Sequence, residues 1–208
     1  MWENKKIVEK NILFSTIHVG TDEEKSTKKR KVIKKKKGCF EMNNTASSNQ
    51  KNGKASITNF IDKIFKLMDT YEINKDTKIL ILSDGDRWIK KIYKAIKEKY
   101  KNNIVSYSLD KFHLINRFKQ LFPYRRRNKI HILKYNWAKK FFFAGYYEAL
   151  LNLLNYHLPY VFGNKKEFLL QTIKLIENNE EGVKSQALEY NIGCHMEGDI
   201  SHYIKASC

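Results

Sequence analysis

The strongest candidate for chemistry is a carboxylate that follows a short apolar run. Residues 79–90 (ILILSDGDRWIK) place Asp84, Gly85 and Asp86 between a predicted strand and a predicted helix. In an α/β sheet the carboxyl ends of the strands line the ligand crevice, so Asp84 would project there and could hold a hard divalent cation such as Mg²⁺. Because Asp and Gly also form ordinary turns and helix caps, this segment alone favours a cap.

A second acidic residue, Asp110, lies where another predicted strand gives way to a helix. Asp110 suits the N-cap position, and His113 would lie one turn along on the same side. Together they could steer a phosphate or orient a metal-bound carboxylate. The two residues alone favour the plainer interpretation, a cap beside a satisfied histidine.

A third candidate segment is residues 193–202 (GCHMEGDISH), near the end of the chain. Neighbouring helical residues point about 100° apart, which disfavours a zinc site built from adjacent Cys and His side chains. Glu197 is therefore the favoured functional group of this segment. The disfavoured zinc ligands are Cys194, His195, His202 and Cys208.

The charge of the chain is large and uneven. Its 208 residues include 40 Lys and Arg against 22 Asp and Glu, a formal net charge of +18, and residues 111–166 hold 12 basic side chains and one acidic one. Such a segment attracts polyanions, and its Arg cluster is interleaved with aromatic residues, as phosphate contact and base stacking require. The alternative is a basic face that reflects codon bias and has no particular partner. The predicted nucleic-acid contacts are Arg117, Lys119, Arg125, Arg126, Arg127, Lys129 and Lys134.

Apolar periodicity predicts the elements that position these residues. The order of strands and helices up to residue 110 favours a mixed sheet with crossover helices, hence an α/β class, and the pattern is helical beyond it. The strands are expected at 7–19, 31–42, 78–83 and 104–109, the helices at 57–71 (capped by Ser56), 88–100, 112–122, 129–158, 165–178, 181–190 and 194–206.

Composition excludes several classes of protein. Three widely spaced cysteines argue against a disulfide scaffold and for a reducing compartment. Residues 1–14 show no signal peptide. The most apolar stretch, 141–162, contains Glu, Asn, His and Pro, which are costly in hydrocarbon. We therefore expect a cytoplasmic protein without a membrane partner.

Taken in order, three segments resemble insertion-sequence transposases of the DDE type, most closely the Lre branch and the transposase-like proteins of integrative conjugative elements. The matching segments are 84–90 (DGDRWIK), 109–117 (LDKFHLINR) and 193–202 (GCHMEGDISH). Any one of them is weak, but three in this order at compatible spacing are specific. A weaker similarity extends over nearly the whole chain.

This resemblance implies an RNase H-like fold with a helical insertion before the last catalytic helix. It also implies two Mg²⁺ (or Mn²⁺) ions held by two Asp and one Glu. Asp84 matches the second catalytic Asp and Glu197 the catalytic Glu, so both are expected metal ligands. Asp110 and His113 match the Asp-x-x-His signature of the wider group. Phosphoryl transfer with two metal ions needs such convergent carboxylates.

The chain departs from the family pattern in three places. The strand that carries the first catalytic Asp would precede Met1, and neither Glu9 nor Asp22 is a convincing substitute. Asp86 stands where the family has a small residue, and Cys208 ends the chain before the family's Ser/Arg/Pro-rich segment. The resemblance therefore predicts a transposase truncated at both ends.

The expected organisation has three parts: an incomplete RNase H-like α/β core (1–110), a basic all-helical insertion (111–190) and a final catalytic-type helix returning to the core (191–208). The expected function is binding of double-stranded DNA by a catalytically incomplete transposase fragment, with homo-oligomerisation left open. One alternative is a non-catalytic nucleic-acid-binding module. A weaker one is a phosphohydrolase of the haloacid-dehalogenase type, whose strand-borne Asp-x-Asp the segment ILILSDGD resembles.

Overall fold

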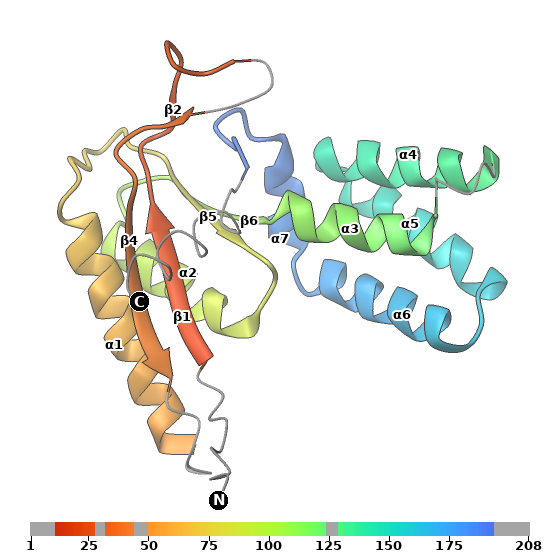
Figure 1. The fold of residues 1–208 in the computed structure, drawn as a ribbon, viewed down its shortest axis with the longest axis horizontal. Helices are drawn as coiled ribbons and strands as arrows, with labels where there is room; N and C mark the ends of the chain where they lie inside the picture. The colour runs from red at the N-terminus through yellow and green to blue at the C-terminus, as the bar shows by residue number, and fades with distance from the viewer. Residues whose placement is uncertain (1–10, 28–31, 44–49, 124–128, 194–208) are drawn as a thin grey trace, which may run out of the picture. The chain divides into compact units, whose positions relative to one another are not determined.

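The computed structural model describes residues 11–27, 32–43, 50–123 and 129–193 (Figure 1). These residues combine short strands with helices, so the α/β class predicted from the sequence is confirmed. None of the helices found in these ranges is both long and apolar enough to cross a membrane.

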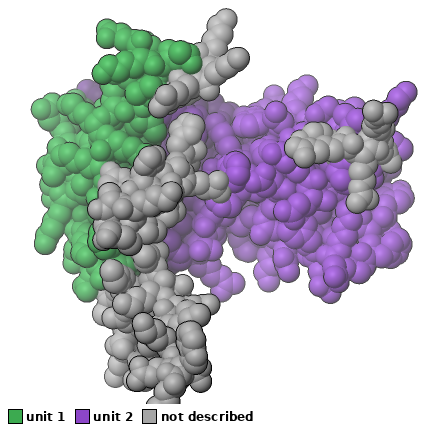
Figure 2. Space-filling model, viewed as in Figure 1, with its two compact units in different colours: residues 1–75, 195–208 green, residues 76–194 purple. Residues whose placement is uncertain are grey.

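The chain divides into two compact units (Figure 2). Unit 1 comprises residues 1–75 and 195–208, and unit 2 comprises residues 76–194. The boundary predicted after residue 110 therefore falls inside unit 2. The helix predicted at 194–206 lies outside the described residues.

Unit 1 is built on a long antiparallel hairpin (Figure 1). β1 (Asn11–Ile17) pairs with β4 (Lys37–Asn43), and farther along the same arms β2 (Thr21–Asp22) pairs with β3 (Val32–Ile33) in the same register. The strands expected at 7–19 and 31–42 thus correspond to the two arms of this hairpin, each interrupted, at 18–20 and at 34–36.

Helix α1 (Gln50–Met68) packs against the β1–β4 hairpin (Figure 1). Phe60, Ile64 and Met68 recur every four residues and are buried, as the apolar periodicity predicted. Lys63 forms an ion pair with Glu41 of β4 at 2.6 Å. The helix begins at Gln50, so the prediction that Ser56 caps it is wrong. The first turns of the helix are polar, and the apolar periodicity therefore did not predict them.

Unit 2 opens with a parallel strand–helix–strand element. β5 (Ile79–Ser83) and β6 (Val105–Leu109) are hydrogen-bonded neighbours, and α2 (Arg87–Lys99) connects them. α2 buries Ile92 and Ile96, which lie on the stripe that predicted it. All three elements lie within a residue or so of their predicted positions.

The remainder of unit 2 is helical and holds the main core (Figure 1). Phe118, Phe122, Phe142 and Leu154 are among its fully buried side chains. The helices are α3 (Lys111–Leu121), α4 (Lys129–Phe143), α5 (Tyr147–His157), α6 (Gly163–Glu177) and α7 (Glu180–Lys184), with 3-10 turns η2 (Leu158–Tyr160) and η3 (Ser185–Ala187).

The single helix predicted over 129–158 is in fact two, α4 and α5. The chain turns at Gly145, whose φ is +69° and where a Cβ would lie 2.6 Å from the Lys184 carbonyl oxygen. Only glycine fits that conformation and that approach. The continuous apolar pattern across the turn concealed the break.

A buried polar network fastens the end of unit 2 to β6. The Gln186 Nε2 group donates to Ser108 Oγ at 2.7 Å, and Asn191 Nδ2 donates to the same oxygen at 2.8 Å. Gly182 lies so close to Tyr107 that a Cβ would come within 2.8 Å of the ring. This network holds the segment that follows α7 against β6.

The described strands form three two-stranded pairs, β1–β4, β2–β3 and β5–β6. An RNase H-like sheet would unite the hairpin and the parallel pair in one layer. That finer architecture stays a prediction.

Candidate functional site

The parallel pairing of β5 and β6 brings Asp84 and Asp110 to the same sheet edge. Ser83 lies opposite Leu109 in the register, and the Asp110 N–H donates to the Ser83 carbonyl at 2.6 Å. Each aspartate is therefore the first residue beyond one of two paired strand ends. The sequence placed both residues after strands, and the register makes them neighbours.

Asp84 sits in a tight, exposed turn. Its Oδ1 accepts a hydrogen bond from the Asp86 N–H at 3.1 Å. Gly85 has a φ of +104°, and a Cβ there would lie 2.4 Å from Leu175. Asp86, rather than Asp84, occupies the N-cap position of α2, and its side chain makes no capping bond. Asp84 is therefore a turn residue that accepts from the Asp86 N–H, and its side chain is exposed to solvent.

Asp110 is the N-cap of α3 and the partner of His113. Its Oδ1 accepts from the Phe112 N–H at 3.1 Å, and the His113 Nδ1–H donates to its Oδ2 at 2.6 Å. The predicted cap is confirmed, with an ion-pair geometry added to it. Since Nδ1 is committed to the carboxylate, Nε2 of this exposed imidazole is the nitrogen left for an outside partner.

The described residues contain no group of three or more His, Cys, Asp or Glu side chains that could hold a metal ion. Asp84 offers an exposed carboxylate, whereas both oxygens of Asp110 already accept hydrogen bonds. These residues form at most a partial ligand set, so the predicted Mg²⁺ (or Mn²⁺) site depends on Glu197. That residue lies outside the described residues, as do Cys194, His195, His202 and Cys208.

Six of the seven predicted nucleic-acid contacts fall into three groups. Arg117 is half-buried between helices, where its guanidinium donates to Thr172 Oγ1 at 3.3 Å and lies 5.1 Å from the Phe168 ring centre. Lys119 donates to a neighbouring amide oxygen, and Lys129 is exposed on α4. The third group, residues 125–127, lies outside the described residues. Arg117 thus contributes to packing, and Lys129 faces solvent.

Helices α3 and α4 carry no carboxylate at all. Three of their lysines, Lys129, Lys139 and Lys140, are exposed on α4. A solvated helix surface normally mixes both signs, so these two helices present an unbalanced positive field. Their basic residues are Lys111, Arg117, Lys119, Lys129, Lys134, Lys139 and Lys140.

The seventh predicted contact, Lys134, belongs to a cluster that the sequence did not reveal. We call it the tyrosine–lysine cluster, and its other members are Tyr156, His157 and Tyr160. The Lys134 ammonium donates to His157 Nδ1 at 3.0 Å and lies 5.7 and 5.5 Å from the ring centres of Tyr156 and Tyr160. The four-residue spacing of the tyrosines was visible in the sequence. Their pairing with a lysine 22 residues upstream (Lys134 to Tyr156) required the antiparallel packing of α4 and α5.

His157 is a buried base in a positive environment. Its side chain is 4% exposed, and burial, followed by repulsion from Lys134, Lys165 and His131, lowers its pKa to about 4. An ammonium group can only donate, so Nδ1 accepts and the proton sits on Nε2. Among the described residues Nε2 has no hydrogen-bond partner. The side chains that repel a proton from this ring are all basic.

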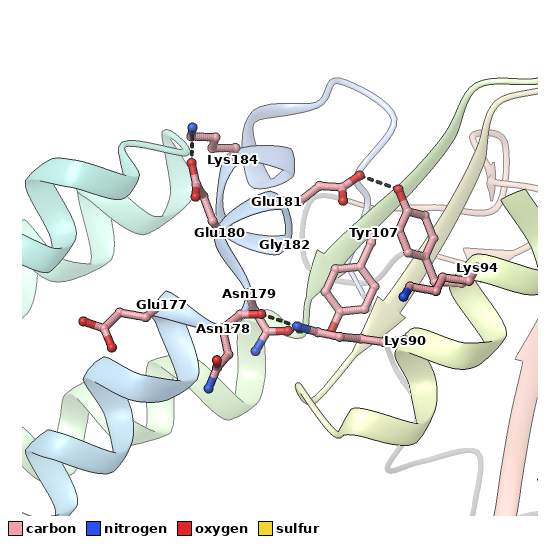
Figure 3. A pocket seen from close by; sticks show the side chains of 11 residues that line it. Lys90, Lys94, Tyr107, Glu177, Asn178, Asn179, Glu180, Glu181, Gly182 and Lys184 are labelled. Atoms are coloured by element: carbon pink, nitrogen blue, oxygen red, sulfur yellow. Dashed lines mark hydrogen bonds and ion pairs between the residues drawn. The ribbon is translucent and has the colours of Figure 1, made fainter.

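A hollow of about 580 Å³ lies between α2, β6 and the junction of α6 with α7 (Figure 3). The Tyr93 hydroxyl donates to Glu181 Oε1 at 2.5 Å, the Tyr107 hydroxyl donates to Asn179 Oδ1 at 3.0 Å, and Lys90 donates to a main-chain carbonyl of the junction. The polar groups of the hollow thus bond largely to one another and tie α2 to the helices.

No family model, curated protein or solved structure matches this chain. The functional assignment therefore depends on the residues and their geometry.

Proposed function

We propose that this chain binds double-stranded DNA through α3 and α4 and is a transposase-type protein. The observation that carries the proposal is the carboxylate-free basic surface of these two helices. Lysines on such a surface release counterions from the DNA backbone when they contact phosphates, and this release drives sequence-independent binding. Lys129, Lys139 and Lys140 are the exposed members of this surface.

The transposase part of the proposal is supported by the edge at which α3 begins. Asp84 and Asp110 follow paired parallel strands there, and the basic helices start at Asp110 itself. A DNA backbone that passes the N-terminal end of α3 would therefore run close to the Asp84 carboxylate. Enzymes that transfer phosphoryl groups need such carboxylates beside a bound phosphodiester. In this proposal Asp84 and Glu197 hold the Mg²⁺ ions, as the resemblance implies.

Duplex binding is tested by measuring the affinity of the whole chain for a labelled DNA duplex at several salt concentrations. We expect the logarithm of the association constant to fall linearly with the logarithm of salt concentration, with a slope of about −0.9 per phosphate neutralised. Fluorescence anisotropy provides the measurement. Affinity that is absent at low salt, or that does not change with salt, would contradict the proposal.

Metal binding is tested by the effect of Mg²⁺ on thermal unfolding. A ligand that binds the folded chain at ten times its dissociation constant stabilises it by about 1.4 kcal/mol, so the wild type should show a higher Tm in Mg²⁺. Asp84→Asn should abolish this increase, whereas Asp86→Asn, a charge-matched control two residues away, should retain it. If Mg²⁺ does not raise the wild-type Tm, the non-catalytic DNA-binding module is the better description.

A further inference from the structure

We infer that the tyrosine–lysine cluster is a stacking platform for unpaired bases of single-stranded DNA. The inference rests on the proposed DNA binding and adds the kind of DNA that this part of the helical surface takes.

The two tyrosine rings of the cluster are exposed and lie beside each other. Tyr156 is 65% exposed and Tyr160 is 61% exposed, and their ring centres are 5.7 Å apart. Phe162, also exposed, follows two residues later. Two exposed rings beside each other form an apolar patch, which is a candidate binding surface. Since aromatic side chains in such sites stack on bases of any sequence, these rings suit a nucleobase.

The lysine of the cluster is held in place before any ligand arrives. The Lys134 ammonium is fixed between the buried His157 imidazole and the faces of both tyrosines. A lysine that is already ordered loses less entropy when it contacts a phosphate. The cluster therefore offers a fixed positive charge close to two stacking faces, and a nucleotide, with its phosphate and its base, can use both.

The charge around the cluster selects an anionic partner. Lys134 and Lys165 lie close enough to His157 to repel a proton from its ring, and no carboxylate acts on that ring in the opposite direction. A neutral apolar partner would leave these charges uncompensated on docking, whereas a polynucleotide neutralises them.

The exposed faces of the tyrosines favour unpaired over paired DNA. In a duplex both faces of each internal base are covered by its neighbours, so a side-chain ring can stack only on a base that is flipped, terminal or single-stranded. Lysines outside the cluster can bind the phosphates of a duplex without touching any base. Removal of the tyrosine rings should therefore affect single-stranded DNA selectively.

The test compares the double variant Tyr156→Leu/Tyr160→Leu with the wild type in binding labelled oligothymidylate and a duplex of the same length. Stacking contributes enough per base that single-strand affinity should fall roughly tenfold or more. Duplex affinity should change by less than about twofold, because no charge is removed. Tyr146→Leu is the matched control, since Tyr146 is 58% exposed on the same helical subdomain but lies outside the cluster. Photo-cross-linking of iodouracil-substituted oligonucleotide should mark the peptide that contains Tyr156 and Tyr160.

The outcomes separate this inference from the function on which it rests. Selective weakening of single-strand binding together with cross-links at the tyrosines supports it. An unchanged single-strand affinity in the double variant, or an equal decrease of both affinities, overturns it while leaving duplex binding established. A wild type that binds neither DNA removes the proposed function and the platform together. An equal decrease in the Tyr146→Leu control would also overturn it, because the effect would then belong to any exposed tyrosine.

Discussion

Replacing Lys129, Lys139 and Lys140 by Gln is expected to weaken duplex binding by roughly 10- to 100-fold at moderate salt. These lysines are exposed on α4, a helix without a carboxylate. For each phosphate that the variant no longer neutralises, the slope of log affinity against log salt becomes shallower by about 0.9, or by up to about 2.7 for all three lysines. Anisotropy titrations of wild type and variant at several salt concentrations measure both quantities.

A second triple variant removes the same charge from elsewhere. Lys66→Gln, Lys75→Gln and Lys101→Gln neutralise three exposed lysines outside α3 and α4. This control should keep most of the affinity and nearly all of the salt slope. If both variants are weakened equally, net charge rather than the α3–α4 surface drives binding, and the proposed location is wrong. Circular dichroism confirms that both variants remain folded.

Replacing His157 by Gln is expected to flatten the dependence of stability on pH between about 6.5 and 4. The folded-state pKa of His157 is lowered to about 4, below its usual value of 6.5. As the pH falls through this window, His157 binds a proton in the unfolded chain but stays neutral in the folded chain. The free energy of unfolding therefore decreases with acidification, by up to roughly 3 kcal/mol from this one group. Urea unfolding at a series of pH values gives the slope.

Carboxylates titrate in the same pH range. The diagnostic quantity is therefore the difference in unfolding free energy between wild type and His157→Gln at each pH. The amide can still accept a hydrogen bond from Lys134 but cannot titrate. The groups that face His157 are Lys134 and His131 from α4 and Lys165 from α6. Lys134→Met should move the His157 titration to higher pH, because it removes the largest repulsion after burial. If the unfolding free energies of wild type and His157→Gln change in parallel with pH, His157 is not the group responsible for the pH dependence.

Much of the secondary structure followed from local pattern. The period-four stripe Phe60–Ile64–Met68 and the apolar run of β5 each predicted an element that the structure contains. Local pattern failed where a single residue decided the outcome. At Gly145 an approach to the Lys184 carbonyl ends a helix inside an uninterrupted apolar stretch.

The sequence predicted the positions of some candidate site residues but not the surroundings of others. Asp84 and Asp110 were recognisable from sequence because each follows a strand and precedes a helix. Arg117 was assigned to nucleic acid on charge alone, whereas its guanidinium packs between α3 and α6. Sequence reports the charge of a side chain, and packing decides whether water or a neighbouring helix surrounds it.

The sequence by itself determined the α/β class, the strand–helix order of the first half and the concentration of positive charge in residues 111–166, because propensity, periodicity and charge are properties of neighbouring residues. Only the tertiary structure placed Asp84 beside Asp110 and enclosed the Lys134 ammonium between His157 and two tyrosines. Those contacts join segments more than 20 residues apart, and they exist because strand register and helix packing bury the apolar faces between them.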